Sequence, residues 1–96
     1  MSGPIVITEE SVPQLPRHVK LRHDQTRDRW VLLAPERVLV PDETALEIVR
    51  ACDGAATVGS IVDSLAAKYT DAPRDAISQD VRAMLQDLAD KGFLVA

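Results

Sequence analysis

The chain has 96 residues, of which 46% are hydrophobic, 3% aromatic and 27% charged, and its formal net charge is −4. This length and apolar content predict one globular domain with an aliphatic core, and they exclude a globally disordered chain. Residues 1–41 carry six basic and five acidic side chains, whereas residues 42–96 carry five basic and ten acidic ones. Such an acidic C-terminal half is poorly suited to binding a polyanion.

Neither cysteine content nor hydropathy indicates secretion or membrane insertion. The single cysteine, Cys52, cannot form an internal disulfide and is typical of a reducing compartment. The N-terminus lacks the basic and apolar regions of a signal peptide, and no stretch is long enough to span a membrane. We therefore expect a cytoplasmic protein that does not associate with membranes.

Residues 1–16 carry three prolines among polar side chains. Proline has no backbone N–H and restricts the residue before it, so a regular helix is not expected. We predict an extended N-terminal arm over residues 1–16, as loose as most chain termini, and one domain over residues 17–96. As an alternative, the segment PIVIT, residues 4–8, pairs with an edge of a second subunit and makes a homodimer.

Period-two alternation begins in VKLRHD, residues 19–24, where apolar and polar side chains take opposite faces. A polar cluster leads from there into RWVLLA, residues 29–34. A turn at Pro35 then leads into RVLV, residues 37–40. Three short strands in succession predict an antiparallel meander, and Pro41 ends its last strand, which is expected at an edge.

Helical periodicity follows the strands. Asp42 can cap a first helix that Gly54 stops, and Thr57 can cap a second helix. Pro73 is expected in the first turn of a third helix, which Gly92 stops. The apolar stripes of the second and third helices are Val58, Ile61, Val62, Leu65 and Tyr69, and Ile77, Val81, Met84, Leu85 and Leu88. Together these elements predict an α+β fold, a three-stranded antiparallel meander followed by three helices.

Catalytic residue sets are missing from this sequence. His18 and His23 fall on opposite faces of a predicted strand, so they cannot jointly bind a metal. Cys52 lies on an apolar stripe next to Asp53, which would raise the pKa of its thiol rather than activate it. No glycine-rich phosphate loop is present. We predict no enzymatic activity, no metal site and no cofactor.

The junction ACDGAATVGSIV, residues 51–62, joins two helices closely enough to suggest a helix-turn-helix. A winged-helix DNA-binding regulator is therefore the alternative function. However, the second helix offers only Lys68 against Asp63, and the third carries three cations against four aspartates. Because base and phosphate contacts need cations on one face, we do not expect nucleic acid as a partner.

Peptide binding fits the predicted layout better. An apolar edge strand at residues 37–40 can accept an added strand through its free backbone groups. The third helix, lying beside that edge, would supply apolar pockets, with Met84 adapting its shape to the ligand. For Met84, Leu85 and Leu88 of this helix, packing in the core is the alternative role.

Three motifs occur in a characteristic order: LLAPERVLV at residues 32–40, CDGAATVGSIV at residues 52–62 and DV..ML..L...GFL at residues 80–94. On these motifs the chain resembles the PqqD family of pyrroloquinoline quinone (PQQ) biosynthesis, from about residue 16 to residue 95. The resemblance implies a winged-helix-like domain, the recognition element of pathways for ribosomally synthesised and post-translationally modified peptides (RiPPs). Such domains bind a leader peptide as an extra strand against the third strand, beside the third helix.

The same resemblance implies a non-catalytic chaperone that binds the precursor peptide PqqA. It would present PqqA to PqqE, a radical S-adenosylmethionine (SAM) enzyme that links a glutamate to a tyrosine. Matched by position, the peptide-binding residues would be Arg37, Val38, Leu39 and Val40 of the strand, and Asp80, Val81, Met84, Leu85 and Leu88 of the helix. The pattern leaves open whether Leu39 or its neighbours point into the groove. Pro41 departs from the leucine typical of the family and removes one backbone amide.

Overall fold

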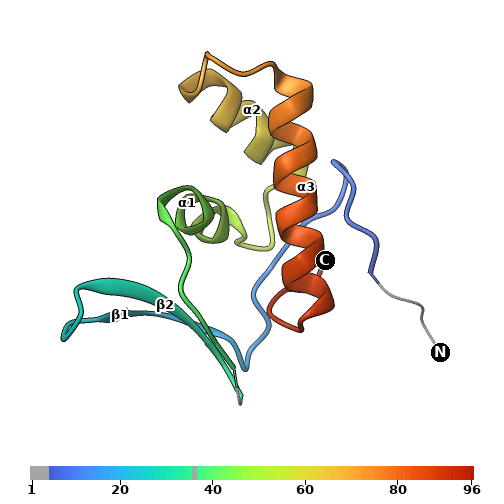
Figure 1. Cartoon of the computed structure of the whole chain (residues 1–96). Helices are drawn as coiled ribbons and strands as arrows, with labels where there is room; N and C mark the ends of the chain where they lie inside the picture. The colour runs from blue at the N-terminus through green and yellow to red at the C-terminus, as the bar shows by residue number, and fades with distance from the viewer. Residues whose placement is uncertain (1–4, 36) are drawn as a thin grey trace.

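The computed structural model of the chain describes residues 5–35 and 37–96. Three strands precede three helices, in the order β1 Lys20–Asp24, β2 Arg29–Ala34, β3 Arg37–Leu39, α1 Glu43–Ala51, α2 Val58–Lys68 and α3 Arg74–Asp90. The helices lie on one side of the β1–β2 hairpin, and α3 is the longest of them (Figure 1). This arrangement confirms the predicted α+β fold.

The sheet is an antiparallel meander in the order β1-β2-β3. Leu32 in the central strand lies opposite Leu21 on one side and Leu39 on the other, so these three side chains share a face. That face packs on the core, where Leu32 is fully buried. Both outer strands are one residue shorter than predicted, since β1 begins after Val19 and β3 ends before Val40.

Side-chain hydrogen bonds to backbone amides cap the starts of α1 and α2. The Asp42 carboxylate accepts from Ala45 N at 2.8 Å, and Thr57 Oγ1 accepts from Ser60 N at 3.1 Å, so both predicted caps are confirmed. Gly54 has φ +80° but lies beyond the helix, because α1 already ends at Ala51 with Cys52 as its cap. Gly54 instead donates its N–H to Pro13 O, which ties the junction to the N-terminal segment.

Helix α3 begins one residue later than predicted and ends as predicted. Pro73 has an extended backbone and precedes the first helical residue instead of lying within the first turn. At the other end Gly92 has φ +83°, Phe93 N donates to Leu88 O, and Gly92 N donates to Ala89 O. These two bonds are those of a Schellman motif, which turns the chain back so that Phe93 and Leu94 join the core.

The core is aliphatic, as the composition predicted, and it draws on all three helices and the sheet. Val81, Leu85 and Leu88 of α3 pack there with the stripe of α2 and with Leu32. Tyr69 differs from its prediction, because it caps the C-terminus of α2 and is exposed, and its hydroxyl donates to Glu47 Oε1. No helix of the described residues is long and apolar enough to cross a membrane.

The described part of the N-terminal arm, residues 5–16, has a turn at residues 9–10 and is not loose. It runs beside α3 (Figure 1), and Ile7 and Pro13 are buried. Ile7 N donates to Gln86 Oε1 at 2.8 Å, and Gln14 exchanges backbone hydrogen bonds with Val95. The expectation of a loosely held terminus is wrong for these residues, because they form hydrogen bonds with α3 and with the C-terminal segment. Pro4, at the start of the PIVIT segment, lies outside the described residues.

Candidate functional site

Two adjoining cavities form a groove along α3. The α1–α3 pocket has a volume of about 350 Å³ and lies between α1, the end of α2 and α3. The β3–α3 pocket has a volume of about 210 Å³ and lies between the end of β3, α1 and α3. Met84 lines both pockets together with Ala45 and Asp42, so the two cavities form one groove from β3 to Tyr69.

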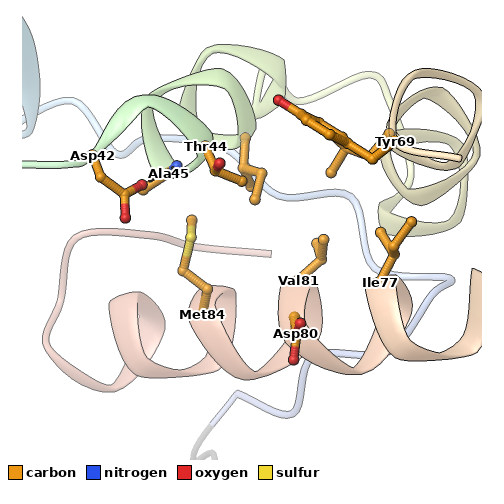
Figure 2. A pocket seen from close by; sticks show the side chains of 10 residues that line it. Asp42, Thr44, Ala45, Tyr69, Ile77, Asp80, Val81 and Met84 are labelled. Atoms are coloured by element: carbon orange, nitrogen blue, oxygen red, sulfur yellow. Dashed lines mark hydrogen bonds between the residues drawn. The ribbon is translucent and has the colours of Figure 1, made fainter. Parts of the chain in front are cut away.

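The walls of the α1–α3 pocket come from opposite helices. Figure 2 shows Val81 and Met84 projecting from α3 toward the side of α1 with Ala45 and Thr44, while Ile77 projects toward Tyr69. Tyr69 closes the far end of this pocket. Because most of this lining is apolar, the pocket suits an apolar side chain and offers few hydrogen bonds to hold it.

The five α3 residues predicted to bind peptide form two groups, one buried beneath the groove and one accessible at its surface. Leu85 is fully buried, and Val81 and Leu88 are nearly so, so they support the groove from the core side. Met84 is half-buried and Asp80 is exposed, which leaves these two side chains accessible to a ligand. Of the five, Leu85 alone lines neither pocket.

The β3 residues are separated by the strand register. Leu39 lies opposite buried Leu32 and lines the β3–α3 pocket, so it points toward the groove. Val38 lies opposite Leu33, is 65% exposed and points away from the core. Val40, past the end of the strand, is 47% exposed and also lines the β3–α3 pocket. Leu39 and Val40 are therefore the groove residues of this segment.

Arg37 has a partner within the chain. Its Nη1 donates to the carbonyl of Lys91 at 3.1 Å, directly after the C-terminus of α3. A cation suits this end of a helix, where unpaired carbonyls gather. Arg37 thereby links the start of β3 to the end of α3, which helps to hold the two walls of the groove together.

The free edge of β3 is the second component of the site. Among residues 5–35 and 37–96, β3 pairs only with β2, and its remaining backbone groups form no other described backbone hydrogen bond. An extended peptide can bind such an edge as a fourth strand. Pro41 lines the β3–α3 pocket and has no N–H to offer, so the edge is restricted to the residues before it.

Acidic side chains surround the groove. Asp42 and Asp80 line the α1–α3 pocket, and Asp87 lines the β3–α3 pocket. The cations of α3 and of its C-cap have partners within the chain: Arg74 pairs with Glu9 and Asp63, Lys91 pairs with Asp87, and Arg82 donates to the Ser78 hydroxyl. The groove therefore favours a ligand with apolar side chains and positive or neutral flanks.

Sequence reasoning missed the α1 side of this groove and its closed end, namely Asp42, Thr44, Ala45, Ile48, Leu65, Tyr69 and Ile77. Several of these had been assigned to caps and core stripes, which they also serve. Their gathering depends on how α1 crosses α3, and helical periodicity within one segment carries no information on that crossing. The small side chain of Ala45, on the apolar face of α1, is the one local sign of a hollow.

The chain's cysteine is not placed for chemistry. Cys52 is buried, and its thiol donates to Ile48 O. Burial, and to a lesser degree the neighbouring Asp53, raise the pKa of this thiol to about 12. Among the described residues no three metal-binding side chains come together.

The sequence matches a known family. The model of PqqD, coenzyme PQQ synthesis protein D, matches residues 29–94. A PqqA binding protein from Rhodopseudomonas palustris (strain HaA2) is 64% identical over 90 residues, which cover 94% of this chain and 87% of that protein. A PqqA binding protein from Gluconobacter oxydans (strain 621H) is 40% identical over 92 residues, which cover 96% of this chain and 95% of that protein.

Two solved structures are similar to the whole fold. The solution NMR structure of the PqqD truncation of Methylobacterium extorquens PqqCD, a functional and stand-alone RiPP recognition element, has a TM-score of 0.77 and 40% identity, covering 94% of this chain and 95% of that one. The crystal structure of PqqD from Xanthomonas campestris has a TM-score of 0.58 and 40% identity, covering 94% and 99%. From these matches in sequence and structure, this chain belongs to the PqqD family.

Proposed function

We propose that this protein is a cytoplasmic peptide chaperone of PQQ biosynthesis that binds the precursor peptide PqqA. The peptide adds as a strand to the free edge of β3 and inserts apolar side chains into the groove along α3. The protein presents the bound peptide to the radical SAM enzyme PqqE and performs no chemistry itself. The observation that carries this proposal is the open strand edge beside an apolar groove.

Relatives support the choice of ligand. Proteins 64% and 40% identical to this chain are named PqqA binding proteins, and a structural neighbour is a stand-alone RiPP recognition element. The alternative, a DNA-binding regulator, is disfavoured because Arg74 of α3 and Lys91, which caps its C-terminus, are paired with carboxylates of this same chain. A helix that reads DNA needs such cations free to contact phosphates and bases.

Direct binding tests the proposal. Titration of ¹⁵N-labelled protein with synthetic PqqA should shift the amide signals of Arg37–Leu39 and of α3 near Met84. Met84→Glu places a charge in the groove, where Met84 lines both pockets, and should weaken peptide binding by tenfold or more, about 1.4 kcal/mol. Ala83→Glu makes the same change at an exposed neighbour on the same helix and should leave affinity unchanged. Equal effects of the two variants, or amide shifts confined to other surfaces, would contradict the groove as the binding site.

We also propose the arm as the contact surface of any homodimer. Its inner side is bound to α3 of the same chain, so its outer side, where Val6 is 71% exposed, would meet the second copy. Light scattering of wild-type protein and of Val6→Asp tests this assembly. A dimer that the substitution dissociates supports it, and a wild-type monomer at high concentration rejects it.

A further inference from the structure

The outer face of the sheet, on the side away from the helices, carries apolar side chains on β2 and β3. In β2 the run Trp30–Val31–Leu32–Leu33–Ala34 is apolar on both faces, a pattern typical of strands covered on both sides. Residues directly opposite each other in antiparallel strands share a face, which places Val31, Leu33 and Val38 on the outer side. None of these three belongs to the core cluster, and the helices lie on the other side of the hairpin (Figure 1).

Two of the three residues of β3, Arg37 and Val38, depart from the usual alternation. A strand with one solvated face normally turns its apolar residues inward and its polar residues outward. In β3 the charged residue Arg37 lies on the inner face, where it reaches α3, while Val38 lies on the outer face with 65% of its surface exposed. Together with half-buried Leu33 and with Val31, which is buried at 8% exposure, Val38 forms an apolar ridge across β2 and β3.

Basic side chains stand beside this ridge. Lys20 lies opposite Leu33 and Arg22 opposite Val31, so both share the outer face, and both are exposed. On the same face Arg29 lies 3.9 Å from Asp24, which partly offsets its charge. Within the described parts of the chain no carboxylate lies at salt-bridge distance from Lys20 or Arg22. The face is thus apolar at its centre and positive at its β1 side.

We propose that this outer face, the ridge Val31–Leu33–Val38 with Lys20 and Arg22, is the docking surface for an acidic, apolar-centred face of the enzyme that receives the peptide. The inference rests on the proposed function for the identity of that enzyme. Charge complementarity selects the partner, because an acidic surface pairs with Lys20 and Arg22 while its apolar centre covers the ridge.

Other occupants fit this face less well. A symmetric dimer through it would bring Lys20 and Arg22 of both copies together, which is unfavourable. A head-to-tail contact with the acidic helices of another copy would leave an unpaired face at each end unless it closed into a ring. Duplex DNA would need more cations for its phosphates, and the aliphatic ridge would gain nothing from it.

The position of this face beside the β3 edge would let the enzyme reach a peptide bound there. Leu39 points from β3 into the groove while Val38 points to the outer face, so the two surfaces meet along one strand. A peptide strand added to β3 would extend the sheet, and an enzyme covering the outer face would contact that strand as well. Peptide and enzyme should therefore bind with positive coupling, each raising the affinity for the other.

Two affinities, measured on the same variants, test the proposal. Arg22→Glu and Leu33→Thr should keep the affinity for synthetic PqqA within about twofold and weaken binding of purified PqqE about tenfold. Arg27→Glu, an equal charge reversal at the exposed hairpin turn, should change neither affinity. Wild-type affinity for PqqE should rise when PqqA is present and fall with added salt. The retained affinity for PqqA shows that each variant is folded.

The outcomes separate the two proposals. If the wild-type protein does not bind PqqA, the proposed function fails. If it binds PqqA but Arg22→Glu and Leu33→Thr leave PqqE binding intact, or PqqE does not bind at all, the docking surface is overturned and the function stands. The docking proposal is equally overturned if these variants instead abolish duplex DNA binding or dissociate a homodimer, because the face would then serve that other occupant.

Discussion

Cys52 shows how one side chain is inactivated by its surroundings. The same residue type, exposed and beside a cation, would be a nucleophile. Here the thiol lies in the core next to Asp53, and its pKa is raised to about 12, chiefly by burial. Asp53 itself is stabilised as a carboxylate, because the amides of Ala56 and Ala55 donate to it and lower its pKa. The sequence predicted both the burial and the direction of the Asp53 effect.

This environment predicts that the native thiol does not react. At pH 8 the folded protein should release almost no chromophore from 5,5′-dithiobis(2-nitrobenzoate), since almost no thiolate forms at a pKa of about 12. One equivalent should react once urea unfolds the chain. Absorbance against time measures both rates, and Cys52→Ala provides the blank. A native thiol that reacts as fast as the unfolded one would contradict the burial of Cys52.

The helices and strands could largely be predicted, because their signals are local. Asp42 and Thr57 are caps whose bonds reach three residues along the chain, and Gly92 ends α3 through its own left-handed conformation. The groove could be predicted only in part. Met84 was expected there from the predicted layout, and the orientation of Leu39 stayed open. Tyr69 and Ala45 join the groove through the packing of α1 and α2 against α3, which no periodicity encodes.

Helix α2 should depend measurably on its cap. Thr57→Ala leaves the N–H of Ser60 without its side-chain acceptor and should lower the free energy of unfolding by about 1 kcal/mol. Thr57→Ser keeps an acceptor oxygen and should restore most of that loss. Urea denaturation followed by circular dichroism measures both variants. A Thr57→Ala protein as stable as the wild type would show that the cap contributes little.

At the scale of the whole molecule, the N-terminal segment binds the helices together. Glu9 accepts hydrogen bonds from Arg74 and Ser78, Arg74 also contacts Asp63 in α2, and Gly59 N donates to Glu9 O. The prolines indicated an extended segment, but its attachment depends on partners distant in sequence: Gly59 lies 50 residues from Glu9, and Gln86 lies 81 residues from Ile5. Local sequence cannot report such contacts.

This network predicts a specific pH dependence. Hydrogen bonds from Arg74 first, and from Ser78 second, lower the pKa of Glu9 from 4.5 to about 2. A carboxylate with a lowered folded-state pKa stabilises the fold above its unfolded pKa, and that contribution is lost as the pH falls from about 4.5 to about 2. Glu9→Gln should therefore be less stable than the wild type at pH 7, and the gap should narrow by pH 3.

Urea midpoints at the two pH values measure that gap. Glu10→Gln is the matched control, since Glu10 is exposed and its side chain forms no salt bridge within the described residues. It should follow the wild type at both pH values. A constant difference between Glu9→Gln and the wild type from pH 7 to pH 3 would show that the Glu9 charge is not what attaches the arm.

The shortness of β3 bears on how long a peptide stays bound. Three residues, followed closely by a proline, offer an added strand only a few backbone hydrogen bonds, each contributing about 1 kcal/mol. Most of the affinity must then come from side chains in the groove, and a ligand held mainly by apolar contacts can leave without breaking a long ladder. Affinity differences of this kind lie mostly in the dissociation rate. A short edge thus favours a brief residence time, as suits a carrier that must hand over its cargo.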